Sequence, residues 1–157
     1  MNAITNIAIT AFIFILMEFV AWFTHKYIMH GFLWNLHEDH HVGKPGFFEK
    51  NDSFFLIFAI PGSICSIYGA LHDYSFVFFI GLGITLYGLA YFLVHEIFIH
   101  QRFKVFKNAN NTYLLALRRA HKIHHKHLGK EDGECFGMLI VPFKYFVEAR
   151  KLAKNKS

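Results

Sequence analysis

The sequence predicts an all-α integral membrane protein with three transmembrane helices, an interfacial or re-entrant apolar segment, and a histidine-rich helical cap on the cytoplasmic side. The 157 residues are 54% hydrophobic and include 20 Phe, which is a membrane composition. Three apolar runs approach the roughly 20 residues that a helix needs to cross a bilayer core of about 30 Å. All 16 Lys and Arg lie within residues 26–50 and 102–156, as the positive-inside rule predicts for cytoplasmic segments.

The three apolar runs define the spanning helices. The first, Ile4 to Phe23, is interrupted only by Glu18, whereas the second, Phe54 to Leu71, and the third, Tyr74 to Val94, contain no charged residue. Only two residues separate the second run from the third, so we expect an antiparallel pair. Its tip should face the side of the membrane opposite the basic blocks.

The remaining segments are shorter and more polar. Residues 51–53 (Asn-Asp-Ser) offer capping oxygens where the second run begins, and a simple helix cap is predicted there. A further helix is expected to begin at Asn111 or Thr112 and to stop at Gly129. Met138 to Val147 is too short to span, so it is predicted to lie in or dip into the interface. Residues 1–157 are predicted to form one domain, since no linker composition divides them.

The histidines are not scattered. Ten of the 12 fall into four clusters: His25 and His30; His37, His40 and His41; His95 and His100; and His121, His124 and His125. Each cluster lies just beyond an apolar run or on the polar helix, so we expect all ten on one side of the membrane. The two others, His72 and His127, are predicted to be surface histidines.

The spacing of the histidines predicts metal ligation. Helical residues three or four apart share a face, so the imidazoles of His121, His124 and His125 continue an apolar stripe and form a chelating face. Residues five apart differ by about 140°, so His25 and His30, like the pair in the third cluster, reach toward separate points or mark a helix bend. Adjacent histidines diverge by about 100°.

The number of imidazoles predicts two metal ions. One ion takes about four to six such ligands, so ten ligands imply two ions side by side. All-nitrogen ligation suits Fe, Zn, Cu or Ni and disfavours Ca or Mg. Carboxylates are then expected to accept hydrogen bonds from the ligands and to offset the metal charge.

Four carboxylates are candidates for that outer role. Glu18 precedes His25 by seven residues, about two turns, and a carboxylate inside a membrane helix usually faces the bundle interior. Glu96 directly neighbours a candidate ligand, as do Glu38 and Asp39. The last two are equally consistent with solvated surface positions.

The motifs together resemble those of the bacterial β-carotene 3-hydroxylases, which are similar in their histidine boxes to the membrane fatty acid hydroxylases. The resemblance covers roughly residues 18–142. It rests on HKYIMHG at 25–31, LHEDHH at 36–41, Asn-Asp at 51–52, YGLAYFLVH at 87–95, HQR at 100–102, AHKIHH at 120–125 and GKE at 129–131.

This resemblance implies an O2-dependent monooxygenase of carotenoid biosynthesis. It implies that the ten clustered histidines bind two non-haem iron ions. The implied reaction is hydroxylation at C3 of β-ionone rings, from β-carotene through β-cryptoxanthin to zeaxanthin. The implied partners are the lipid bilayer, a carotenoid, and a ferredoxin with its NAD(P)H-dependent reductase. The implied location is the cytoplasmic membrane, crossed several times, with the histidines on the cytoplasmic side.

Other functions share some of these features. A hydroxylase of fatty acids or sterols, a desaturase or a carotenoid ketolase would use similar histidine boxes. In a different class, a membrane metal transporter normally places ionisable ligands near the bilayer midplane, whereas the second and third apolar runs contain none. Nucleic-acid binding is not expected, because the basic residues alternate with apolar runs instead of forming an exposed stripe.

Overall fold

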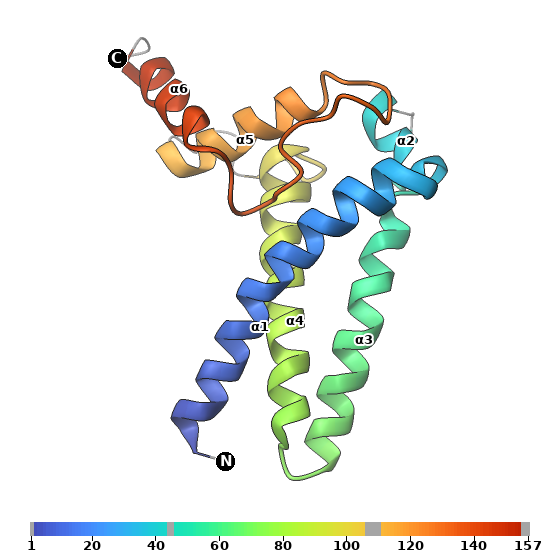
Figure 1. Ribbon diagram of the computed structural model, residues 1–157, viewed down its shortest axis with the longest axis vertical. Coiled ribbons are helices and arrows are strands. Elements are labelled where there is room, and N and C mark those ends of the chain that lie inside the picture. Colours follow the sequence, from blue (N-terminus) through green and yellow to red (C-terminus); the bar gives the residue numbers. More distant parts are fainter. Residues whose placement is uncertain (1, 44–45, 106–110, 155–157) are drawn as a thin grey trace.

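A computed structural model describes residues 2–43, 46–105 and 111–154, and within them every regular element is a helix (Figure 1). Three helices are long and apolar enough to cross a membrane. They are α1 (Ala3–Phe23) with its π-helical continuation η1 (Thr24–Phe32), α3 (Asp52–Leu71), and α4 (Phe76–Phe92) with its π-helical continuation η2 (Leu93–Ile99). The three predicted spanning segments are therefore confirmed.

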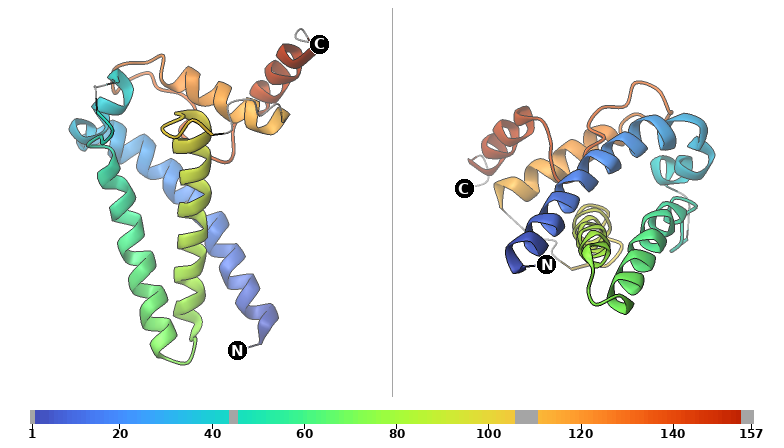
Figure 2. Two further views of the ribbon diagram at one scale, coloured as in Figure 1. Left: turned by 180° about the vertical axis from the view of Figure 1, so that it is seen from behind. Right: turned by 60° about the horizontal axis from the view of Figure 1, so that its bottom comes forward.

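The short helices gather at one end of the three long ones. Helices α3 and α4 form an antiparallel hairpin, and α1 crosses α4 at a tilt (Figures 1 and 2). Helix α2 (Trp34–Val42) follows η1, α5 (Thr112–His124) lies across the same end, and α6 (Phe143–Lys154) packs on α5. The α3–α4 turn and the amino-terminal end of α1 lie at the opposite end. This arrangement confirms the predicted hairpin.

Glycines allow the long helices to approach closely. A Cβ on Gly81 of α4 would lie 2.5 Å from the backbone nitrogen of Ser66 on α3. A Cβ on Gly83 would lie 2.7 Å from Cβ of Ile13 on α1. Helix α4 thus faces both neighbours through glycine, as is usual where membrane helices pack without a hydrophobic driving force between them.

The predicted starts of α3 and α5 are confirmed, whereas the capping role of Asn51 and the helix stop at Gly129 are wrong. Asn51 precedes α3, but its side chain makes no capping bond; Oδ1 instead accepts from Nδ1 of His37 at 2.7 Å. The helix that begins after Asn111 does have the predicted cap, since Oδ1 accepts from the amides of Tyr113 and Leu114. That helix ends at His124 and not at Gly129, because the chain turns away there toward the other histidine-bearing helices.

The last apolar stretch is divided between a loop and a helix. Residues 138–142 form no helix, and α6 begins at Phe143. Ile140 and Phe143 are 69% and 74% exposed. Such exposed apolar side chains suit a position in the membrane interface, which stays a prediction.

The glycine packing yields a stability prediction. Gly81→Ala should destabilise the fold by about 1–3 kcal/mol, because the added methyl meets the α3 backbone. Gly88→Ala is the matched control on the same helix, since a methyl added there would find nothing within 4 Å. That change should be neutral or stabilise by up to roughly 1 kcal/mol. Thermal unfolding in detergent measures both, and equal melting temperatures for the two variants would contradict the packing.

Candidate metal centre

The two π-helical segments bring histidines five residues apart onto one face. In a π-helix the backbone hydrogen bond runs from residue i+5 to residue i, so such residues lie one above the other. The amide of His100 donates to the carbonyl of His95 at 2.9 Å in this way. His25 and His30 lie within η1, and their ring centroids are 5.2 Å apart. Of the two alternatives predicted for these pairs, separate directions are therefore wrong. The other, a local departure from the regular helix, is found, because the helix changes its period at each pair and η1 is kinked at Gly31.

Nine of the ten predicted ligands form two groups. The first histidine group contains His25, His30, His37, His41 and His124, and the second contains His40, His95, His100 and His121. Within each group, one nitrogen from every ring lies within 4.8 Å of the others. All nine are buried except His100, which is partly buried. The adjacent histidines diverge as predicted, since His40 and His41 enter different groups.

The distances between ring nitrogens fit a bound metal ion. Metal–imidazole bonds of about 2.0–2.1 Å place neighbouring ligand atoms roughly 2.9–3.4 Å apart in octahedral or tetrahedral geometry. In the first group, Nε2 of His37 lies 3.1 Å from Nε2 of His25 and 3.2 Å from Nε2 of His41. In the second group, Nε2 of His40 lies 3.2 Å from Nε2 of His95. Nε2 of His124 is buried without a hydrogen-bond partner, which also fits a ligand atom.

The three remaining histidines differ from one another. The ring of His125 lies between the groups, with its centroid 4.6 Å from that of His41 and 4.4 Å from that of His121. Its Nε2 is buried without a hydrogen-bond partner. His72 is exposed at the far end of the hairpin, beside Tyr68. His127 is partly buried and belongs to neither group.

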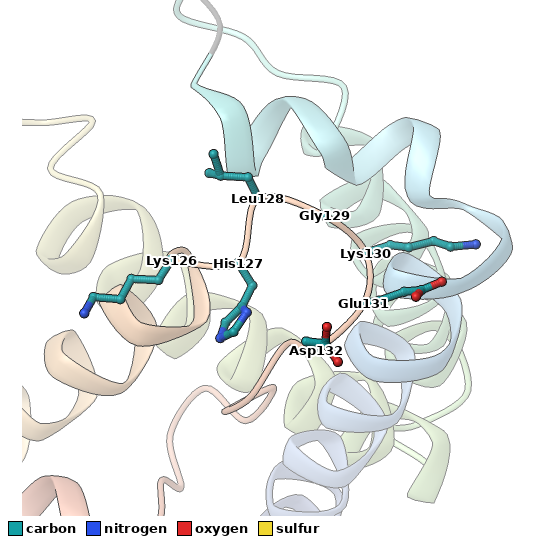
Figure 3. A pocket seen from close by; sticks show the side chains of 7 residues that line it. All are labelled: Lys126, His127, Leu128, Gly129, Lys130, Glu131 and Asp132. Atoms are coloured by element: carbon teal, nitrogen blue, oxygen red, sulfur yellow. The ribbon is translucent and has the colours of Figure 1, made fainter.

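The α5–α6 loop (residues 125–142) supplies backbone acceptors to the first group. The carbonyl oxygens of His127, Lys130, Glu134 and Phe136 accept, at 2.9–3.0 Å, from Nδ1 of His41, His30, His124 and His25 respectively. Figure 3 shows the beginning of this loop, Lys126 to Asp132, curving past the helices of the first group. Because a carbonyl can only accept, each ring holds its proton on Nδ1 and leaves Nε2 free for a metal.

Glu18 anchors this loop instead of contacting a histidine. Its carboxylate accepts from the amides of Met138, Leu139 and Ile140 at 2.9 Å and from the hydroxyl of Tyr87 at 2.7 Å. Glu18 is only 8% exposed. The prediction that Glu18 accepts from a ligand is therefore wrong, because three amides of a distant loop saturate its oxygens. Sequence spacing within one helix cannot reveal such a partner.

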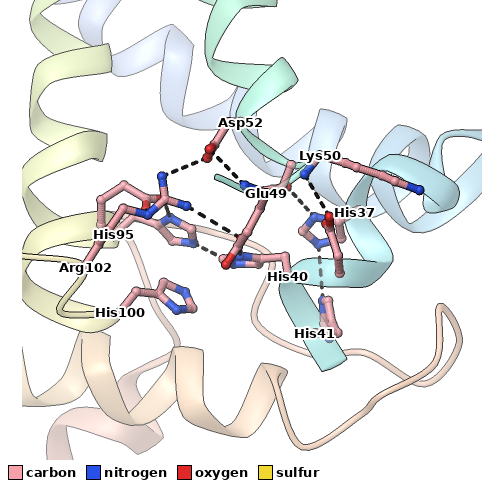
Figure 4. A network of polar contacts seen from close by, with 12 residues as sticks. His37, His40, His41, Glu49, Lys50, Asp52, His95, His100 and Arg102 are labelled. Carbon is pink, nitrogen blue, oxygen red and sulfur yellow. Dashed lines mark hydrogen bonds and ion pairs between the residues drawn. The ribbon is translucent and has the colours of Figure 1, made fainter. Parts of the chain in front are cut away.

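Carboxylates contact the second group (Figure 4). Oε1 of Glu96 accepts from Nδ1 of His95 at 2.6 Å, in the outer position predicted for Glu96. Glu49, which the sequence did not single out, accepts from Nδ1 of His40 at 2.8 Å. Glu38 is exposed, which confirms its alternative interpretation as a solvated residue. Both interpretations of Asp39 are wrong, because it is only 4% exposed and its Oδ2 accepts from the amide of Lys50 at 2.8 Å. Asp39 thereby holds the segment that carries Glu49.

Burial keeps the metal-free imidazoles neutral. Desolvation lowers the pKa of His41 to about 4 and that of His124 to about 3, although a backbone hydrogen bond opposes the shift at each ring. Desolvation also lowers the pKa of His37 to about 2. These rings are therefore uncharged at neutral pH, which is the protonation state that a metal ligand needs.

An apolar cavity of about 900 Å³ opens beside the histidines. It lies between the spanning helices, with walls that include Met17, Ile84 and Phe92. Its polar lining includes His25 of the first group together with Glu49, Glu96 and Arg102, and Phe136 of the loop also lines it. The cavity therefore connects the apolar part of the bundle to the candidate metal centre.

Comparison with known proteins identifies relatives over most of the chain. Residues 10–146 match the fatty acid hydroxylase family. The chain is 41% identical over 139 residues to a beta-carotene hydroxylase of Pseudescherichia vulneris, covering 88% of this chain and 74% of that protein. It is 42% identical over 126 residues to a beta-carotene hydroxylase of Pantoea ananas, covering 80% of this chain and 71% of that protein.

Plant proteins match the same region. Identity to beta-carotene hydroxylase 2, chloroplastic, of Capsicum annuum is 40% over 129 residues, covering 80% of this chain and 41% of that protein. No solved structure gives a significant match.

The loop anchor can be tested by substitution. Glu18→Leu should destabilise the protein by several kcal/mol, because each buried donor left without an acceptor costs about 1–3 kcal/mol and four donors lose theirs. Glu18→Gln keeps one acceptor oxygen and should cost less. Thermal unfolding and metal content measure the effect. A Glu18→Leu variant that melts like the parent would contradict the anchor.

The lowered pKa values predict acid sensitivity of the metal-free protein. Free imidazole has a pKa of about 6.5, so below that pH the unfolded chain binds protons that the buried rings of the folded chain do not. The free energy of unfolding should therefore fall as pH drops from about 6.5 toward 4, and these rings should add no pH dependence above about 7. Melting temperatures of chelator-treated protein between about pH 4.5 and 8 test this. A flat profile on the acid side of the imidazole pKa would contradict it.

Proposed function

The chain belongs to the fatty acid hydroxylase family, and on that premise we propose that it hydroxylates C3 of the β-ionone rings of carotenoids. The substrate is proposed from the relatives named beta-carotene hydroxylase, which are 41% and 42% identical to this chain. The reaction is proposed to convert β-carotene through β-cryptoxanthin to zeaxanthin. Residues 1–157 are proposed to act as a single hydroxylase domain.

The observation that carries the proposal is the apolar cavity that ends at the histidine groups. A rod-like hydrocarbon dissolved in the bilayer can enter between the spanning helices only through apolar walls such as those of this cavity. Its volume of about 900 Å³ lies within the range of small-molecule sites. One end of the substrate would then meet His25 and Phe136, while the rest stays among the helices.

Iron is the metal that best fits this chemistry. We propose that all ten clustered histidines, His125 included, hold two non-haem iron ions. Zinc suits the same nitrogens but has no redox chemistry, so it cannot support a hydroxylation. When bound, the two iron ions would supply the activation of O2, one oxygen atom of which enters the substrate while the other leaves as water.

The chain's own residues bind, orient and exclude water. The apolar walls hold the substrate, and the ring of Phe136 packs against those of His25, His30 and His124 at centroid distances of 5.0–5.4 Å. This packing places an apolar ring against three rings of the first group. The backbone acceptors of the α5–α6 loop fix each imidazole, so the reacting carbon meets a rigid site.

The basic residues support a cytoplasmic position for the histidines. All 16 Lys and Arg lie in the two blocks that flank the spanning helices at the histidine end, so this end is proposed to face the cytoplasm in a multi-pass inner-membrane protein. There it can receive the two electrons that each hydroxylation consumes. The proposed donor is a ferredoxin, reduced by an NAD(P)H-dependent reductase.

Two alternative functions remain distinguishable. The family name leaves a fatty acid or sterol substrate as the nearest alternative, since an acyl chain also fits an apolar cavity. A metal transporter is disfavoured because the histidine groups lie at one end of the bundle and not near the middle of the spanning helices.

Pigment analysis tests the proposal. Bacteria that make β-carotene should accumulate zeaxanthin when they express this chain. His124→Ala should abolish the product, because it removes a fully buried ring from the first group. His72→Ala, at the exposed far end, is the matched control and should leave the yield unchanged.

Other outcomes identify the alternatives. Unchanged β-carotene despite a folded, iron-loaded protein would reject the carotenoid substrate, and lipid analysis of the same cells would then test for hydroxylated acyl chains or sterols. Zeaxanthin formation by the His124→Ala variant would reject the assignment of the first group to the reaction.

A further inference from the structure

The two histidine groups differ in the charge of the groups that hold their rings. In the first group all five Nδ1 atoms donate to neutral oxygens: four backbone carbonyls at 2.9–3.0 Å and the side-chain amide of Asn51 at 2.7 Å. In the second group two of the four Nδ1 atoms donate to carboxylates. These are the contacts of His40 with Glu49 at 2.8 Å and of His95 with Glu96 at 2.6 Å.

The guanidinium of Arg102 contacts both carboxylates. Figure 4 shows it beside Glu49 and Asp52. Nε of Arg102 lies 3.0 Å from Oε2 of Glu96, and one terminal nitrogen lies 3.8 Å from Oε2 of Glu49. The other terminal nitrogen donates to Oδ1 of Asp52 at 2.9 Å. The amide of Arg102 also donates to the carbonyl of Glu96 at 2.9 Å. Three carboxylates thus surround one cation, which leaves an excess of negative charge beside the second group.

This network is largely shielded from solvent. The side chains of Arg102 and Glu96 are 15% and 10% exposed, and that of Glu49 is 23% exposed. Charge interactions in such a setting are screened less than at an open surface. Arg102 is also fixed by the ring of Phe47, 5.6 Å from its guanidinium. These contacts indicate a role for Arg102 inside the site.

An imidazole donates electrons to a metal more strongly when its Nδ1 proton is bound by a carboxylate than when it is bound by a carbonyl. It draws the Nδ1 proton toward itself and raises the basicity of Nε2, and removal of such outer partners typically weakens metal affinity by about 10–100-fold. The first group has no such contact among the bonds that hold its five rings. The difference is therefore built into the protein before any metal binds.

We propose that the two metal positions are electronically unequal, with the second histidine group as the stronger donor, and that Arg102 is the positioning residue that maintains this inequality. It does so by holding Glu49 and Glu96 against His40 and His95. The inference rests on the proposed di-iron function but not on the identity of the substrate. The second position is then the one that better stabilises additional positive charge on its metal.

The test uses two isosteric substitutions, one of which removes a negative charge while the other adds one. Glu49→Gln keeps an acceptor oxygen for His40 but removes its charge, and Asn51→Asp keeps the acceptor for His37 but adds a charge. The full chain in detergent is loaded with ⁵⁷Fe(II) without O2 or carotenoid and studied by Mössbauer spectroscopy. The parent should show two quadrupole doublets of equal area. Glu49→Gln should shift one doublet, and Asn51→Asp should shift the other.

Two further measurements separate a positioning role from a structural one. In a chelator competition, Glu49→Gln should lower the affinity of the protein for one of its two iron ions by about 10–100-fold and leave its affinity for the other unchanged. Arg102→Lys keeps the charge but cannot bridge two carboxylates, so it should shift the same doublet as Glu49→Gln and leave unchanged the doublet that Asn51→Asp shifts, which a general loss of structure would not do.

The contrary results are equally specific. A single doublet in the parent, or one doublet shifted by both Glu49→Gln and Asn51→Asp, would overturn the inequality. An Arg102→Lys spectrum identical to that of the parent would overturn the role of Arg102. Because no substrate is present, two separately shifted doublets in a chain that makes no zeaxanthin would keep the inequality and reject only the proposed substrate.

Discussion

The structure depends on the cost of burying polar groups at one end of an apolar helical bundle. Imidazoles, carboxylates and backbone amides that leave water there must each find a partner. The first histidine group meets this requirement through carbonyl oxygens of the α5–α6 loop, which are themselves backbone groups that need donors. Glu18 then satisfies the amides at the end of the same loop. One set of reciprocal hydrogen bonds therefore holds both the ligands and the fold.

The π-helical segments explain how spanning helices also serve as ligand-bearing elements. A regular α-helix directs residues five apart to different sides, by about 140°. The change to i+5 hydrogen bonding in η1 and η2 removes that difference just where each helix leaves the apolar part of the bundle. α1 and α4 can thus remain continuous while each contributes two histidines to the centre.

The two histidine groups differ in the residues that contact their outer nitrogens. Neutral oxygens hold the rings of the first group, whereas carboxylates and Arg102 lie beside the second. The apolar cavity reaches both sets of residues, since its lining includes His25 as well as Glu96 and Arg102. Asp39 contributes indirectly, by holding the amide of Lys50 in the segment that carries Glu49 and Asn51.

The sequence by itself determined the three spanning helices, the antiparallel pair, the common location of the histidines and the divergence of adjacent ones, whereas the assignment of each histidine to a group came from the tertiary structure. These features follow from run length, charge distribution and the angular spacing of adjacent residues, all of which are local properties.

Only the tertiary structure decided the partners of those histidines. Glu49 and the carbonyl of Phe136 approach rings 9 and 111 residues away in sequence, and Glu18 binds amides 120 to 122 residues away. Such contacts depend on how loops return to the bundle, which no local period encodes, so Glu18 and Asn51 received the wrong roles. The direction of His25 and His30 likewise depended on a π-helical turn, whose i+5 hydrogen bonds replace the α-helical period only where the surrounding contacts stabilise them.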